Sequence, residues 1–124
     1  MEEAKLERNL QLMQHVQQAA GVRIILALKG FSMWSTFETI KNYLQGATAS
    51  SVWEAKLAKY EMGGEVHAYS PAYKESDMAE LVNLVDHLSF NSLTQWQRHK
   101  AAIDASNVSV GLRVNPENQE ADTP

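Results

Sequence analysis

Segments typical of β-strands and of α-helices alternate along this chain, and strand starts recur roughly every twenty residues. The expected strands are 23–29, 47–50, 65–70, 87–91 and 108–115. Apolar residues at helical spacing fill the intervals between them. Because two parallel neighbours must be joined by a crossover segment, usually a helix, this order predicts βαβ units around one parallel sheet.

Glycines and capping residues mark the expected helix ends. A first helix that carries Leu6 and Leu10 is expected to stop at Gly21, and the next two at Gly46 and at 63–64. The capping-box pattern, a serine followed three residues later by Glu or Gln, occurs at Ser35, Ser51 and Ser92. The helix before 87–91 is expected to be capped by Ser76 or Asp77.

The expected strands present two different faces. In the first, Ile24, Leu26 and Leu28 alternate with Arg23, Ile25, Ala27 and Lys29, and in the last, Val108, Val110, Leu112 and Val114 alternate with small or polar residues. One face suits helices, and the other is narrow and partly polar, as inside a barrel. We therefore predict an α/β fold, a partial (β/α)8 barrel with about five parallel strands.

Polar residues gather where the expected strands end, which is the edge at which barrel enzymes build their active sites. These residues are Lys29, Ser50, Ser51, Ser70, Asn91, Ser92, Arg113 and Asn115.

Composition excludes several classes of partner and site. A net charge of −4, a pI near 5.5 and the lack of a Lys/Arg cluster argue against a nucleic-acid partner. The absence of cysteine excludes disulfides and thiolate metal sites. The longest apolar run, 24–28, is too short to span a membrane, and the start lacks signal-peptide features. We therefore predict a cytoplasmic protein with no membrane partner.

Lys29 is the candidate catalytic residue, since it ends an apolar strand and precedes a glycine. Removal from water would disfavour the charged amine and make it a usable nucleophile for a Schiff base, although a solvated charge at a strand end is the simpler interpretation. Histidines 67 and 87 lack a partner at metal-ligand spacing, so no metal site is predicted. Tryptophans 34, 53 and 96 are expected to fill the layer between helices and sheet.

Five segments carry a resemblance to a known family. They are Ala27-Leu-Lys-Gly-Phe-Ser-Met-Trp34, Thr48-Ala-Ser-Ser-Val-Trp-Glu54, Glu65-Val-His-Ala-Tyr-Ser-Pro-Ala-Tyr-Lys74, Phe90-Asn-Ser92 and Gly111-Leu-Arg-Val-Asn-Pro-Glu117. From about residue 5 to 117 the chain closely resembles the carboxynorspermidine (carboxyspermidine) decarboxylases, which belong to the fold-type III, alanine-racemase-like enzymes that use pyridoxal 5'-phosphate (PLP).

The resemblance implies specific roles. Lys29 would hold the cofactor as a Schiff base, and Arg113 would lie near the cofactor ring and its phenolic oxygen. From the residues alone, an ion pair of Arg113 with Glu117 or Glu54 is an equally reasonable interpretation. The implied activity is decarboxylation of a polyamine carboxylate to norspermidine or spermidine, by a homodimer.

The family pattern is longer than this sequence. Residues 1–116 correspond to the amino-terminal part of the PLP-binding barrel, 117–124 read as a loose polar tail, and the phosphate-binding glycine-rich loop has no counterpart here. Two alternatives stay open. One is a truncated, catalytically silent half-barrel that binds a partner, and the other is a small PLP-carrying barrel similar to the PLP homeostasis proteins.

Overall fold

The computed structural model of the chain describes residues 2–117, so the predicted tail lies outside the described residues except for Glu117. The elements are α1 (Glu3–Ala20), β1 (Leu26–Ala27), the 3₁₀ turn η1 (Trp34–Thr36), α2 (Phe37–Ile40), β2 (Gly46–Ala49), α3 (Val52–Leu57), the π-helical turn η2 (Ala58–Met62), β3 (Glu65–Tyr69), α4 (Glu75–Leu81), β4 (His87–Phe90), α5 (Leu93–Asp104) and β5 (Ser109–Leu112). Within this range no helix is both long and apolar enough to cross a membrane.

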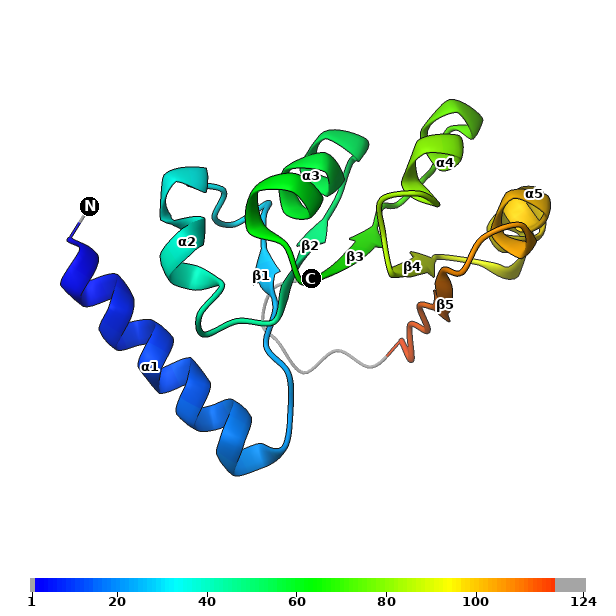
Figure 1. Ribbon diagram of the computed structural model, residues 1–124. Helices are drawn as coiled ribbons and strands as arrows, with labels where there is room; N and C mark the ends of the chain where they lie inside the picture. Colours follow the sequence, from blue (N-terminus) through cyan, green and yellow to red (C-terminus); the bar gives the residue numbers. More distant parts are fainter. Residues whose placement is uncertain (1, 118–124) are drawn as a thin grey trace.

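The five strands form one parallel sheet in sequential order, β1-β2-β3-β4-β5. Helices α2 to α5 lie along one side of it (Figure 1). An order that never reverses, with helices on one face, is the winding of a (β/α)8 barrel rather than of a doubly wound sheet. The predicted fold class is confirmed.

The hydrophobic core fills the layer between the sheet and its helices. Ala47, Val66, Leu88 and Phe90 point into this layer from the strands, and all four are essentially inaccessible to solvent. The helices contribute the other side of the layer with Phe37, Ile40, Ala55, Ala58, Met78, Leu81 and Ile103. Burial of this apolar area is the main driving force that holds the helices on the sheet.

Strand β5 and two tryptophans depart from the predicted packing. All four residues of β5 are exposed, so Val110 and Leu112 lie beside Leu93 and Trp96 of α5 but are not covered by the helix layer as expected. Trp34 and Trp53 are 65% and 78% exposed, so neither fills the helix layer, whereas Trp96 packs against the core. The reason at β5 is that no described element follows it to cover its face.

Two of the three predicted capping boxes are present. Ser51 and Ser92 accept hydrogen bonds from the backbone N–H of Glu54 (3.2 Å) and Gln95 (3.1 Å). The third is wrong, because residues 34–36 form a 3₁₀ turn in which the Thr36 hydroxyl donates to the Met33 carbonyl. Helix α4 begins after Lys74 without a side-chain cap, so neither Ser76 nor Asp77 caps it.

Between α1 and β2, some helix and strand ends also differ from the prediction. Gly21 terminates α1 in the left-handed conformation as expected, but α2 ends at Ile40, and Gly46 begins β2 instead of ending a helix. Strand β1 is only two residues long. The chain turns immediately afterwards, because the Ala27 carbonyl accepts hydrogen bonds from the N–H groups of Gly30 and Phe31.

Tyr73 closes the loop after β3 against the next strand. Its buried hydroxyl accepts from Ser70 N (2.9 Å) and donates to the Ser89 carbonyl (2.9 Å). Burial raises the pKa of Tyr73 to about 12.

We expect Tyr73→Phe to lower the free energy of unfolding by about 1–2 kcal/mol at pH 7, since two partly buried backbone groups lose their hydrogen bonds to the hydroxyl. Because the pKa of Tyr73 is raised in the folded state, the stabilisation that its neutral hydroxyl provides is complete below pH 10. This stabilisation is lost as the pH rises toward 12. Urea denaturation at pH 7 and at pH 11 measures both effects. The gap between wild type and variant should shrink at pH 11, and a gap that widens there would contradict this interpretation.

Candidate active site

Lys29 lies at the carboxyl end of β1, two residues after the last residue of the strand. Its position is set by the turn that the Ala27 carbonyl closes and by Leu28, which is buried and donates its N–H to the Thr48 carbonyl (3.1 Å). Leu28 therefore anchors the chain on β2 immediately before the lysine. The structure places Lys29 at the sheet edge where barrel enzymes carry their catalytic residues.

The expected removal of Lys29 from water is not present in this structure, because its side chain is exposed. The described strands form an open sheet, so no sixth to eighth strand covers the concave side of β1. Within residues 2–117 the Lys29 amine has no hydrogen-bond or ion-pair partner. An accessible and unpaired amine remains available to react with an aldehyde.

Arg113 lies at the same edge, just beyond β5, and contacts Tyr69 instead of a carboxylate. Its Nη1 donates to the Tyr69 hydroxyl (2.6 Å), and its guanidinium carbon is 5.6 Å from the centroid of the Tyr69 ring. The backbone N–H of Arg113 donates to the Phe90 carbonyl (2.8 Å), which fixes the chain. The alternative ion pairs with Glu54 and Glu117 are absent within residues 2–117.

Asn91 connects this arginine and tyrosine to the loop after β3. Its Oδ1 accepts from the Tyr69 hydroxyl (2.9 Å), and its Nδ2 donates to the carbonyls of Ser70 (2.9 Å) and Pro71 (3.0 Å). Gln95 completes the network, since its side chain accepts from Asn91 N and donates to the Pro71 carbonyl. The carboxyl ends of β3, β4 and β5 are thereby held together by one hydrogen-bonded group.

We expect Asn91→Ala to lower the free energy of unfolding by about 2 kcal/mol, because the Ser70 carbonyl loses its side-chain donor, the Tyr69 hydroxyl loses its acceptor, and the Pro71 carbonyl keeps only Gln95. The matched control is Asn83→Ala, whose side chain makes a single exposed bond to the Ala79 carbonyl. Thermal and urea denaturation measure the difference. Equal losses in the two variants would show that the network does not stabilise this edge.

The same edge continues at β2 through Ser50 and Glu54. The Glu54 carboxylate accepts from Ser50 N (2.6 Å), and its own N–H is capped by Ser51. Gln95 reaches back to Asn91 N in the same way at the start of α5. At both positions the third residue of the helix therefore fixes the first residue after the preceding strand.

Lys29 and Arg113 share an edge but are not in contact. They follow the first and the fifth strand, and neighbouring strands lie about 4.8 Å apart. Sequence reasoning also missed Tyr69, the residue that positions Arg113. The available signal was its alternation with His67, which places both side chains on the polar face of β3.

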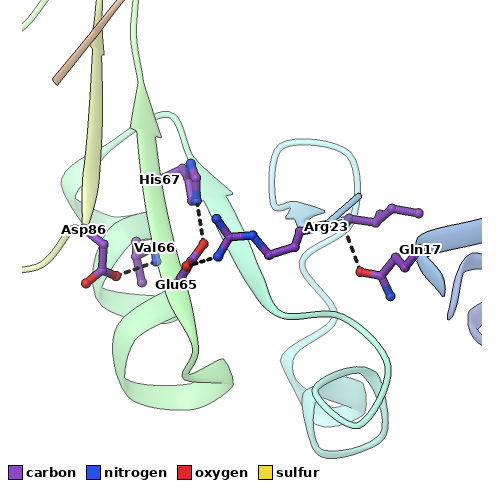
Figure 2. Close-up of polar contacts among 7 residues, drawn as sticks. Gln17, Arg23, Glu65, Val66, His67 and Asp86 are labelled. Carbon is purple, nitrogen blue, oxygen red and sulfur yellow. Dashed lines mark hydrogen bonds and ion pairs between the residues drawn. The ribbon is translucent and has the colours of Figure 1, made fainter. Parts of the chain in front are cut away.

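A second polar cluster lies on the concave face nearer the amino ends of the strands. His67 and His87 are register partners on β3 and β4, with ring centroids 4.2 Å apart. Figure 2 shows Glu65 between His67 and Arg23. Oε2 of Glu65 lies 3.3 Å from His67 Nε2, and its carboxylate also forms an ion pair with the Arg23 guanidinium. The hydrogen bond with His67 is the main cause that lowers the pKa of Glu65, with Arg23 adding to it. Spacing in the sequence did not indicate this cluster, because strand register brings Glu65, His67 and His87 together.

No family model matches the sequence. Among curated proteins, carboxyaminopropylagmatine decarboxylase of Synechocystis sp. is 44% identical over 117 residues. Carboxynorspermidine/carboxyspermidine decarboxylase of Campylobacter jejuni is 43% identical over 117 residues. The same-named protein of Herminiimonas arsenicoxydans is 40% identical over 116 residues. These alignments cover 94% of this chain but only 30–31% of each relative. The chain is homologous to one segment of these decarboxylases.

Solved structures agree with the sequence comparison. The crystal structure of carboxynorspermidine decarboxylase from C. jejuni, complexed with norspermidine, superposes with a TM-score of 0.89 at 40% identity, over 94% of this chain and 31% of that one. A D-threonine aldolase from Filomicrobium marinum gives a TM-score of 0.78 at 17% identity, over 93% of this chain and 33% of that one. The second match shows the fold alone. The predicted resemblance and barrel architecture are confirmed.

Proposed function

We propose that this chain forms the lysine-bearing segment of a PLP-dependent decarboxylase that converts carboxynorspermidine or carboxyspermidine into norspermidine or spermidine. The observation that carries the proposal is 40–44% identity to polyamine-carboxylate decarboxylases over 94% of the chain. The chain spans about 30% of those relatives, so the complete activity requires more than these residues. A cytoplasmic homodimer is part of the proposal.

The residues at the carboxyl edge fit the cofactor. An aldehyde needs an accessible amine, and Lys29 is exposed with no partner for its amine in the part of the chain that is described. PLP also carries anionic oxygens, and Arg113 offers a guanidinium at the same edge. A guanidinium has five N–H donors, of which Tyr69 engages one, so the others can meet such an oxygen.

The positions of these residues suggest a separate role for the cofactor and for each side chain. When bound, PLP supplies an electron sink that stabilises negative charge at the carbon that loses carboxylate. Lys29 Nζ would hold the cofactor aldehyde and could hold or return a proton at that edge. Tyr69 and Asn91 keep the Arg113 guanidinium in a fixed orientation.

The test is a chimera in which this chain replaces the aligned segment of the C. jejuni decarboxylase. We expect the purified chimera to release norspermidine from carboxynorspermidine at a rate within about tenfold of the parent, because the two segments share the fold and are 43% identical. A chimera that folds, binds PLP and has no activity above the background would contradict the proposal.

The second candidate is a catalytically silent half-barrel that pairs with a partner. It is favoured by the exposure of all four residues of β5, whose outer edge has no strand beside it in the described chain. The chimera separates the two candidates, since a silent segment has no reason to preserve decarboxylation.

A further inference from the structure

A side-chain cluster outside the carboxyl edge combines two imidazoles with a carboxylate. Glu65 and His67 lie on the same face of β3, two residues apart, and His87 is the register partner of His67 on β4. One ligand atom from each residue lies within 4.8 Å of the other two, and all three residues are partly buried. The register of β3 with β2 and β1 aligns His67 with Thr48 and Ala27, so the cluster lies deeper than Lys29.

The donor set suits a transition metal better than a hard cation. Zinc and its neighbours in the first row prefer imidazole nitrogen together with carboxylate oxygen, whereas Mg²⁺ and Ca²⁺ require oxygen ligands. Tetrahedral zinc, with bonds of 2.0–2.2 Å, needs ligand atoms about 3.4 Å apart. Small rotations of three partly buried side chains can close the present spacing to that value.

The surroundings of the cluster leave these ligand atoms available. His87 makes no hydrogen bond within residues 2–117 and is held by stacking on His67, with an angle of 22° between the rings. Arg23 pairs with Oε1 of Glu65, while Oε2 faces His67. Arg23 therefore orients the carboxylate without occupying both oxygens (Figure 2).

The neighbouring acid is not a fourth ligand. Asp86 Oδ2 accepts the backbone N–H of Val66 (2.8 Å), which commits its carboxylate to the start of β3 (Figure 2). A metal held by three protein ligands keeps a fourth position for water or a small ligand.

We propose that Glu65, His67 and His87 form a three-ligand site for a divalent transition metal, with zinc as the best match. The site ties β3 to β4 across the concave face and is independent of the cofactor at the carboxyl edge. It goes beyond the proposed decarboxylase function, and neither depends on the other.

The test is calorimetric titration of the metal-stripped 124-residue chain with ZnCl₂ at neutral pH. We expect one zinc per chain with a Kd of about 1 µM or tighter. His87→Phe, His67→Phe and Glu65→Gln should each weaken binding at least about tenfold, because each removes one ligand and keeps the side-chain volume close to the original. His15→Phe, an exposed histidine on α1, is the matched control and should bind as the wild type does.

A second measurement on the wild-type chain does not depend on how the variants fold. Zinc should shift the imidazole NMR signals of His67 and His87 and leave those of His15 and His99 unchanged, and Co²⁺ should give the intense visible bands of a tetrahedral site. The proposal is overturned if zinc shifts the four histidines alike or not at all, or if folded His87→Phe binds as tightly as His15→Phe.

Discussion

Gly46→Ala is expected to lower the free energy of unfolding by at least about 4 kcal/mol, which is a large fraction of the stability of a domain of this size. Gly46 is the register partner of Glu65 where β2 meets β3. A Cβ at this position would lie 2.0 Å from the Glu65 carbonyl oxygen and 2.8 Å from its carbonyl carbon. These are backbone atoms, so no side-chain rotation relieves the contact, and the two strands must separate.

Gly30→Ala is the matched control, since a Cβ there meets only the Ala27 carbonyl oxygen at 3.5 Å, an ordinary contact. Urea unfolding followed by circular dichroism measures both variants. We expect Gly30→Ala to remain within about 1 kcal/mol of the wild type. If Gly46→Ala behaves like Gly30→Ala, the close approach of β2 and β3 is incorrect.

Lys29→Ala is expected to reduce decarboxylation by the chimera at least about a thousandfold, equivalent to about 4 kcal/mol of transition-state stabilisation. The reason is that the variant loses both the attachment point of the cofactor and an amine that can hold a proton. Lys74→Ala removes another exposed lysine, which lies just before α4, and should leave the rate unchanged.

The two variants must be compared for attachment of the cofactor as well as for the rate of decarboxylation. We expect Lys29→Ala to lose the visible absorption that PLP acquires when attached to a lysine, while its circular dichroism spectrum matches that of the wild type. A Lys29→Ala chimera that keeps both its absorption band and its activity would remove Lys29 from the mechanism.

Local signals predicted those features that depend on neighbouring residues alone. Ser51 and Ser92 cap their helices because each finds its N–H donor three residues ahead in the same turn. Gly21 ends α1 because a left-handed residue is required there. The alternation of strand residues likewise predicted a polar concave face, which places Arg23 next to Glu65.

Features that depend on strand register could not be predicted from spacing. His67 and His87 are twenty residues apart in sequence, and only their pairing across β3 and β4 makes them neighbours. The contact of Arg113 with Tyr69 bridges 44 residues in the same way. Gly46 looks like a helix stop in the sequence, whereas its requirement is the close approach of Glu65 from another strand.

The exposure of Lys29 has a related cause. Whether a lysine at a strand end is removed from water depends on which strands close around it, and sequence around the lysine itself contains no such information. In the described chain the concave side of β1 is open, so the amine is accessible.

The central claim is that the amine of Lys29 carries the cofactor. The most direct measurement is borohydride reduction of the PLP-loaded chimera, followed by protease digestion and mass spectrometry of the peptides. We expect one pyridoxyl group per chain, on the peptide that contains Lys29-Gly-Phe-Ser-Met-Trp34. Label on a different lysine, or none on this peptide in a chimera that decarboxylates its substrate, would contradict the account.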